Sequence, residues 1–335
     1  MAERKKLFEV RGLTTRFHTE AGTATAVSNV DFDIFEGEVL GIVGESGSGK
    51  SVTALSLTRL IPNPPGEITS GSVLFQGRDL LKLSYDQLHD IRGKEVAMIF
   101  QEPMTSLNPV FTVGYQIEEI IDLHENMSKD EIRRRAVEML RLVGIPDAEK
   151  RMKDYPHQFS GGMRQRAMIA MALACNPALL IADEPTTALD VTIQAQIIDL
   201  MLEMKRRRQE AAVMLITHDL AVVAETCDRV IVMYGGVIQE VAPVGELFER
   251  PLHPYTLGLL GSLPRPELQS QERLSTIRGT VPSILEMPKG CKFCTRCDQV
   301  MPRCEREEPR LLDVGGGHLV RCHLMAEVDV EEVEQ

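Results

Sequence analysis

The amino-acid sequence predicts an α/β fold in which parallel strands bring polar residues to one edge of a sheet. An apolar run at residues 39–43 leads into a glycine-rich turn and then a helix. Two more apolar runs, at residues 179–182 and 212–216, each end directly in polar residues. Because ligands bind outside the carboxyl ends of the strands in open α/β sheets, we expect functional residues at these three ends.

Length and composition limit the classes of protein that the chain can represent. Its 335 residues suffice for one large domain and a smaller one, and an apolar content of 43% is ordinary for a packed core. A formal net charge of −12 and the absence of tryptophan argue against binding of nucleic acid, which needs a basic face and stacking rings. No uncharged run is long enough to span a bilayer, and the first residues lack the apolar core of a signal peptide. We therefore expect a cytoplasmic location.

Strand patterns surround the first of the apolar runs. Residues 7–35 contain alternating apolar and polar side chains, and residues 71–77 resemble an edge strand. We expect these segments to form a small antiparallel sheet. Phe17 lies at the end of one strand, where its ring can stack on a base, although a core phenylalanine explains this residue equally well.

The glycine-rich turn has the composition of a phosphate-binding loop. Residues 44–51 read G-E-S-G-S-G-K-S and match the pattern G-x-x-x-x-G-K-[ST]. Glycines without a Cβ let the backbone lie close around an anion, with its N–H groups pointing inward. We expect Lys50 to reach the β- and γ-phosphates of a nucleotide and Ser51 to offer its hydroxyl to Mg²⁺. The predicted binding residues of this loop are Gly44, Glu45, Ser46, Gly47, Ser48, Gly49, Lys50 and Ser51.

A helical subdomain is predicted between two strands of the sheet. The apolar run at residues 96–100 ends on Gln101. Residues 113–144 then follow a helical pattern, in which Ser128 and Glu131 have the spacing of a capping box.

Two adjacent acids follow the apolar run at residues 179–182. Asp183 and Glu184 stand at the carboxyl end of this predicted parallel strand. Two adjacent negative charges are unfavourable there unless they bind a ligand or take part in catalysis. Asp183 can hold Mg²⁺ through water, and Glu184 can polarise an attacking water.

Two further candidate sites are weaker by themselves. Ser160, Gly161 and Gly162 open a helix and form a second candidate anion site, for which plain N-capping is the alternative. His218 follows the run at residues 212–216, where it can contact a γ-phosphate, although a lone histidine is more often structural.

With these motifs in this order, residues 7–250 resemble the ATP-binding subunit of ABC transporters. The matching motifs are Walker A (44–51), the Q-loop (Gln101), the signature motif (160–165), Walker B (179–183), the catalytic Glu184, the D-loop (188–190) and the switch His218. The signature reads F-S-G-G-M instead of L-S-G-G-Q, so it keeps the serine and glycines that face phosphate. The resemblance implies a cassette at residues 1–250, with a RecA-like P-loop core, an antiparallel β subdomain and an α-helical subdomain inserted at residues 102–160. A small loop-rich, cysteine-containing C-terminal domain would follow at residues 251–335.

The resemblance also implies that two cassettes hydrolyse ATP with Mg²⁺ between them. Glu184, His218 and Gln101 would then be catalytic, and Ser51 and Gln101 would bind Mg²⁺. Each ATP would lie between the Walker A loop of one cassette and the Ser160 region of the other. The implied nucleotide-binding residues beyond residues 44–51 are Phe17, Asp183, Ser160, Gly161, Gly162 and Asp190.

A finer match is to the D-type ATPase subunit of dipeptide and oligopeptide importers. It rests on Q-E-P-M-T-S-L-N-P after residue 100, on I-A-D-E-P-T-T-A-L-D-V-T-I-Q-A-Q-I and on H-P-Y-T at residues 253–256. Implied partners are a second, related ATPase subunit in a heterodimer, two integral membrane permease subunits and an extracytoplasmic peptide-binding protein, at the cytoplasmic face of the inner membrane. Nickel and other small-solute importers share most of these stretches. A soluble ABC ATPase acting on DNA or ribosomes is less favoured, because the chain has neither two cassettes nor a long inserted coiled coil.

Five of the seven cysteines lie between residues 291 and 322, which in a cytoplasmic protein favours metal binding over disulfides. Four thiolates suit either an iron–sulfur cluster or structural Zn²⁺. The resemblance implies a [4Fe–4S] cluster on Cys291, Cys297, Cys304 and Cys322. Cys294 is a fifth cysteine in this segment, and the C-x₂-C-x₂-C spacing would also allow it to be a ligand. Which four of the five cysteines bind the metal therefore stays open.

Overall fold

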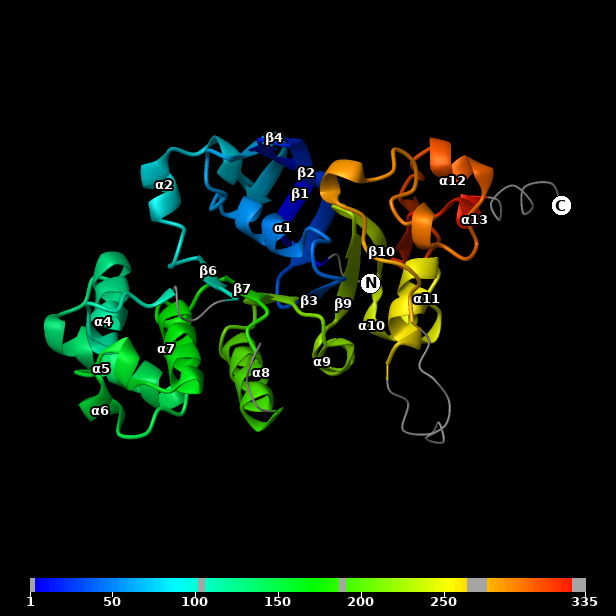
Figure 1. Ribbon diagram of the computed structural model, residues 1–335. Helices are drawn as coiled ribbons and strands as arrows, with labels where there is room; N and C mark the ends of the chain where they lie inside the picture. Colours follow the sequence, from blue (N-terminus) through cyan, green and yellow to red (C-terminus); the bar gives the residue numbers. More distant parts are fainter. Residues whose placement is uncertain (1–3, 102–105, 187–190, 264–275, 327–335) are drawn as a thin grey trace. The chain divides into compact units, whose positions relative to one another are not determined.

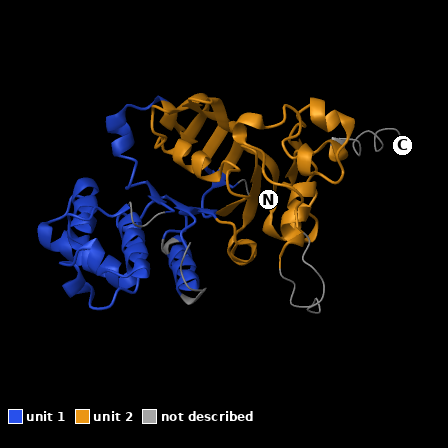
Figure 2. Ribbon diagram, viewed as in Figure 1, with its two compact units in different colours: residues 1–7, 34–38, 82–216 blue, residues 8–33, 39–81, 217–335 orange. Residues whose placement is uncertain are grey.

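The computed structural model describes residues 4–101, 106–186, 191–263 and 276–326 (Figure 1). The chain divides into two compact units (Figure 2). Unit 1 comprises residues 1–7, 34–38 and 82–216, and unit 2 comprises residues 8–33, 39–81 and 217–335.

An antiparallel sheet in unit 2 has the strand order β2-β1-β4-β5. Its strands are β1 (Lys6–Thr19), β2 (Gly22–Phe35), β4 (Gly66–Phe75) and β5 (Arg78–Asp79). Phe8 of β1 lies opposite Phe75 of β4, and the centroids of their buried rings are 5.0 Å apart. This sheet confirms the antiparallel subdomain expected from the strand patterns, and β4 begins earlier than the sequence indicated.

The strand that leads into the glycine-rich loop is β3 (Val39–Val43), and all five of its residues are buried. It pairs in parallel with β9 (Arg229–Tyr234). The next strand in the chain, β10 (Val237–Pro243), pairs antiparallel with β9. A continuous apolar strand of this kind is typical of a parallel sheet that is covered on both faces. The helices of unit 2 up to residue 261 are α1 (Lys50–Leu57), α9 (Leu220–Thr226), α10 (Val244–Glu249) and α11 (Pro254–Gly261).

The C-terminal residues of unit 2 extend this pairing instead of forming a separate sheet. β12 (Leu319–Val320) pairs with β10 on one side and with β11 (Leu312–Asp313) on the other. On β10, the fully buried Glu240 accepts a 2.7 Å hydrogen bond from His318 Nε2. Burial by itself would raise the pKa of Glu240, but the bond with His318 and further hydrogen bonds hold that pKa below its usual value. The other elements here are short, namely η3 (Ile284–Glu286), η4 (Cys294–Arg296), α12 (Pro302–Arg306) and α13 (His323–Ala326).

Unit 1 contains three parallel strands in the order β8-β7-β6. They are β6 (Val96–Ile99), β7 (Leu179–Asp183) and β8 (Ala212–Ile216), and every residue of β7 and β8 is buried. The helices of the unit are α2 (Tyr85–His89), α4 (Val113–His124), α5 (Lys129–Leu142), α6 (Ala148–Arg151), η2 (Pro156–Gln158), α7 (Gly161–Leu173) and α8 (Val191–Arg207), with η1 (Leu80–Lys82) at the boundary in sequence between the units.

The helices between β6 and β7 confirm the predicted helical subdomain. Ser128 and Glu131 form the expected capping box at the start of α5, since Ser128 N–H donates to the Glu131 carboxylate over 2.8 Å. Ile132, Ala136 and Leu140 are buried on one face of the helix, as the 3.6-residue spacing predicted. Within the described ranges no helix combines the length and the apolar character needed to cross a membrane.

We predict that Leu180→Ala lowers the free energy of unfolding by about 2–5 kcal/mol, because Leu180 is fully buried in β7 and its truncation leaves a cavity. The matched control is Leu123→Ala in α4, where 60% of the side chain is exposed and the loss should be below about 0.5 kcal/mol. Urea unfolding followed by circular dichroism measures both. Equal losses in the two variants would contradict the burial of β7.

Candidate nucleotide-binding site

The loop at residues 44–51 is closely packed against neighbouring backbone. Gly44, Gly47 and Gly49 all have positive φ angles, of 149°, 78° and 103°. A Cβ on Gly44 would collide with the carbonyl oxygen of Met233, and one on Gly49 would lie 2.7 Å from the carbonyl oxygen of Ala26. Two of the glycines are therefore required both by backbone conformation and by space.

The ammonium group of Lys50 is held by the loop itself. Lys50 is 6% exposed, and its Nζ donates to the carbonyl oxygens of Gly44, over 2.7 Å, and Glu45, over 3.0 Å. α1 begins at Lys50, so the positive end of the helix dipole also lies at the loop. The half-buried Ser51 is the second residue of this helix.

A buried hydroxyl in the loop fits a phosphate ligand. Ser48 is 2% exposed, and within the described part of the chain its Oγ has no hydrogen-bond partner. A buried hydroxyl without a partner is costly, and a phosphate oxygen would satisfy it. Phe17, also in unit 2, is half-buried on β1 opposite Gly66, so its predicted stacking on a base stays a prediction.

The carboxylates lie at the end of β7 in unit 1. Asp183 is the last residue of the strand and is 4% exposed. Glu184 has a φ of 46°, a left-handed conformation that costs a non-glycine residue about 1–3 kcal/mol, and its N–H donates to the Ile216 carbonyl oxygen over 2.9 Å. Gln101, which follows β6, donates its Nε2–H to Glu184 Oε2 over 3.0 Å. The structure thus brings together two of the residues predicted to be catalytic.

The signature residues form the N-terminus of α7, also in unit 1. Ser160 is the N-cap of this helix, and its Oγ accepts a hydrogen bond from Met163 N over 3.3 Å. The capping role considered from sequence is therefore present. Ser160 and Gly161 are exposed, and a Cβ on Gly161 would have no described atom within 4 Å, so this helix end is open. The buried Gln165 donates its Nε2–H to the Pro185 carbonyl oxygen, which joins the signature helix to the loop after Glu184.

The other predicted site residues lie in unit 2 or outside the described residues. His218 is exposed in unit 2, directly before Asp219, which caps α9 by accepting from Ala221 N. Asp190 and the rest of the D-loop at residues 188–190 lie outside the described residues.

Sequence reasoning missed two residues at the loop, Tyr255 and Arg296. Tyr255 Oη accepts a 2.8 Å hydrogen bond from Glu45 N, and Arg296 forms an ion pair with the Glu45 carboxylate. They stand 210 and 251 positions from Glu45 in the chain, so no local pattern could have revealed them.

The described residues do not support the predicted metal site. Cys291, Cys294, Cys304 and Cys322 are buried, and Cys297 is half-buried. Across the described ranges, however, no three Cys, His, Asp or Glu side chains form a group that could hold a metal ion. Burial raises the pKa of Cys291 to about 12 and of Cys322 to about 11, which keeps these thiols neutral near pH 7.

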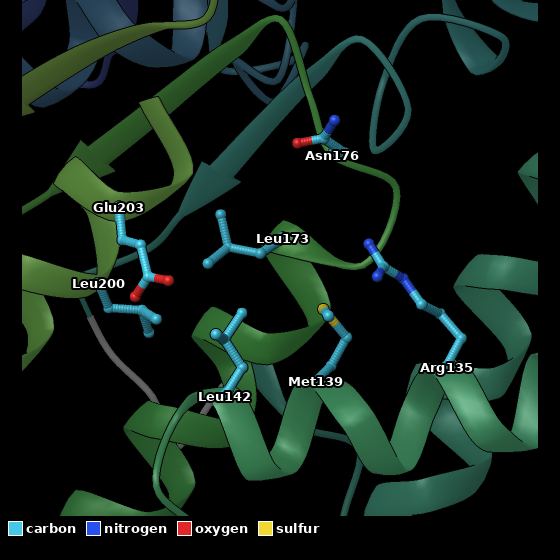
Figure 3. A pocket seen from close by; sticks show the side chains of 7 residues that line it. All are labelled: Arg135, Met139, Leu142, Leu173, Asn176, Leu200 and Glu203. Carbon is cyan, nitrogen blue, oxygen red and sulfur yellow. The ribbon is translucent and has the colours of Figure 1, made fainter. Parts of the chain in front are cut away.

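A small cavity in unit 1 is no candidate for the nucleotide. It lies among α5, α7 and α8 and has a volume of about 40 Å³, which is room for a few water molecules and too little for a nucleotide (Figure 3). Its lining residues are Arg135, Met139, Leu142, Leu173, Asn176, Leu200 and Glu203.

Comparison with known proteins identifies the family. The family model of the ABC transporter matches residues 27–187, and that of the oligopeptide/dipeptide transporter C-terminal region matches residues 239–304. A probable peptide ABC transporter ATP-binding protein of Sinorhizobium fredii is 54% identical over 322 residues, which cover 96% of each chain. This chain belongs to the ABC transporter family.

Other matches agree with this assignment. The oligopeptide transport ATP-binding protein OppD of Bacillus subtilis is 51% identical over 320 residues, which cover 96% of this chain and 89% of that protein. Among solved structures, a dimeric ATP-binding cassette bound to ADP and phosphate is 30% identical with a TM-score of 0.64, over 71% of this chain and 98% of that one. The cassette fold and the ATPase activity predicted from the sequence are therefore confirmed. The chain is an ABC-type ATPase, which uses ATP with Mg²⁺.

Proposed function

We propose that this chain is the ATP-hydrolysing subunit of an importer for dipeptides or oligopeptides. The observation that carries the proposal is the match of residues 239–304 to the C-terminal region of oligopeptide/dipeptide transporters, since the ABC cassette alone is common to many transporters. The named functions of the relatives, peptide and oligopeptide transport, support the same solute class. The proposed division is a cassette at residues 1–250, with the helical insertion at residues 102–160, and an extension at residues 251–335.

The proposed roles of the site residues follow from their chemistry. Residues 44–51 would bind the phosphates, with Lys50 and the amides of the loop balancing their charge. Ser51 and Gln101 would bind Mg²⁺, with Asp183 holding it through water, and the bound ion would neutralise charge on the phosphates. Glu184 would polarise the attacking water, and its hydrogen bond from Gln101 supports this role because it fixes the direction of the carboxylate. His218 would contact the γ-phosphate.

We propose that the nucleotide is bound between two cassettes, the second being a related chain. Ser160, Gly161 and Gly162 would contact the nucleotide of the partner, and Asp190 would lie at the same interface. The exposed N-terminus of α7 supports this, since open N–H groups at a helix end attract phosphate. The dimeric form of a similar cassette supports the pairing.

The helical subdomain carries a surface suited to a membrane partner. Val110 is 69% exposed, Phe111 43% and Tyr115 46%, and the rings of the last two stack with centroids 5.0 Å apart. Contiguous exposed apolar side chains mark interaction sites. We propose that this patch, at residues 110–115, binds one of two permease subunits at the cytoplasmic face of the inner membrane. An extracytoplasmic peptide-binding protein would deliver the solute.

We further propose that the cysteines at residues 291–322 bind a metal group, with [4Fe–4S] favoured over Zn²⁺. The support is chemical, because metal binding stabilises thiolates that burial otherwise disfavours. The backbones of three of these residues are hydrogen-bonded to one another, since Cys291 N–H donates to the Cys304 carbonyl oxygen over 2.8 Å and Cys294 N–H donates to the Cys291 carbonyl oxygen over 3.1 Å. Cys291, Cys297, Cys304 and Cys322 are the proposed ligands, and Cys294 is a fifth candidate.

We predict that Glu184→Gln lowers the rate of ATP hydrolysis by about 10²- to 10⁴-fold while MgATP still binds, because the amide cannot accept a proton from water. Steady-state hydrolysis and calorimetric MgATP binding measure the two effects. The control is Glu149→Gln, whose carboxylate is 74% exposed in the helical subdomain and should be neutral. Unchanged turnover in Glu184→Gln would remove Glu184 from the catalytic role.

The transport complex can be tested by purifying the chain from its native membranes. We expect two permease subunits and a second cassette to copurify, and Val110→Asp to reduce their recovery because it places a charge in the apolar patch. The matched control is Val300→Asp, at a valine in unit 2 that is 45% exposed. Equal recovery with both variants would argue against the patch, and recovery of ribosomes or DNA in place of permeases would overturn the proposed function.

The metal proposal predicts a brown protein after anaerobic purification, with roughly four iron and four sulfide per chain. Elemental analysis and visible absorption measure this. A colourless sample with one zinc would replace the cluster with a structural zinc site. A sample with neither metal would agree with the free thiols of the structure and remove the proposal.

A further inference from the structure

Glu45 belongs to the phosphate loop, yet two residues of the C-terminal region hold it in place. Its carbonyl oxygen accepts from Lys50 Nζ over 3.0 Å, and its N–H donates to Tyr255 Oη over 2.8 Å. Its carboxylate forms a two-point ion pair with Arg296, with Nη1–Oε2 at 2.5 Å and Nη2–Oε1 at 3.1 Å. All of these residues belong to unit 2. Glu45 therefore contacts both the ammonium group of Lys50 and the C-terminal region at residues 239–304.

The side chain of Arg296 is also held by contacts other than those with Glu45. Arg296 is 8% exposed, and its Nε–H donates to the Arg278 carbonyl oxygen over 2.9 Å. The guanidinium carbon lies 5.7 Å from the ring centroid of Tyr234 and 6.0 Å from that of Phe293. Contacts of this kind with aromatic rings and a carbonyl leave the planar guanidinium a single orientation, which matches a carboxylate at two points.

The ion pair removes an electrostatic conflict from the loop. A carboxylate in a loop that binds a triphosphate repels the ligand, because both are negative. The Glu45 side chain is 30% exposed and that of Arg296 only 4%, so the pair is partly shielded from water and its attraction is less screened than at an open surface.

We propose that Arg296 is a positioning residue of the phosphate loop: it acts chiefly by neutralising the carboxylate of Glu45, while Tyr255 holds the backbone N–H of the same residue, so that the loop accepts MgATP. The C-terminal region thereby sets the affinity of the cassette for its nucleotide. This inference rests on the proposed nucleotide site at residues 44–51.

The test compares variants of the full chain by calorimetric MgATP binding and by steady-state hydrolysis. We expect Arg296→Ala to raise Kd and KM about 10-fold, because Glu45 is left uncompensated, while kcat changes little because Glu184 is untouched. Adding Glu45→Gln to Arg296→Ala should recover most of the affinity, since it removes the repelling charge. Arg296→Lys, which keeps the charge and loses the two-point contact, should lie in between. The control is Arg303→Ala, which breaks an exposed ion pair with Glu307 and should be neutral.

Each outcome supports or overturns the proposal. Unchanged MgATP binding by Arg296→Ala would overturn it. A loss of binding that the added Glu45→Gln does not recover would also overturn it, because a purely structural role of Arg296 would give that result. If Arg296→Ala does not fold, Arg296→Lys and the single variant Glu45→Gln decide. Glu45→Gln should bind MgATP at least as tightly as the unchanged chain, and a 10-fold weaker binding would contradict the repulsion. Failure of the unchanged chain to bind MgATP would instead overturn the proposed nucleotide site, and this inference with it.

Discussion

The close approach of backbone to backbone around residues 44–51 is the constraint on which the phosphate loop depends. The carbonyl oxygens of Met233 and Ala26 leave no space for a side chain on Gly44 or Gly49. Met233 lies on β9, and β9 pairs in parallel with β3, the strand that leads into the loop. The pairing of two buried strands thus determines the shape of the loop, and the loop in turn gives Lys50 the carbonyl partners that hold its ammonium.

The carboxylate end of β7 shows how backbone conformation and side-chain bonding act together. Glu184 takes a left-handed conformation that few residues other than glycine adopt, and its N–H is tied to the end of β8. The amide of Gln101 then orients the carboxylate. Strain at such a position persists only when the surrounding structure determines it, which is typical of functional sites.

The sequence alone predicted those structural elements that depend on residues close together in the chain. Strand β3 and its glycine loop, the capping box of Ser128 and Glu131, and the strand that ends at Asp183 all follow from patterns within about ten residues, and the structure contains them. Contacts between distant segments could not be predicted in this way. The bonds of Glu45 to Tyr255 and Arg296 join residues more than 200 positions apart, and Gln165 reaches Pro185 only because α7 packs beside the loop. Cysteine spacing left the metal site undecided: the described residues form no group that could hold a metal ion, because spacing along a chain does not determine which thiols converge.

The pairing of β12 with β10 has a consequence for any shortened version of the chain. Without the last segment, β10 would present unpaired N–H and C=O groups along one side, and open strand edges of this kind promote association between molecules. Glu240 would also lose His318 and its backbone partners Leu252 and His253, all of which lie after residue 250. A polypeptide cut near residue 250 should therefore aggregate more readily than the whole protein, although every motif for nucleotide chemistry lies before the cut.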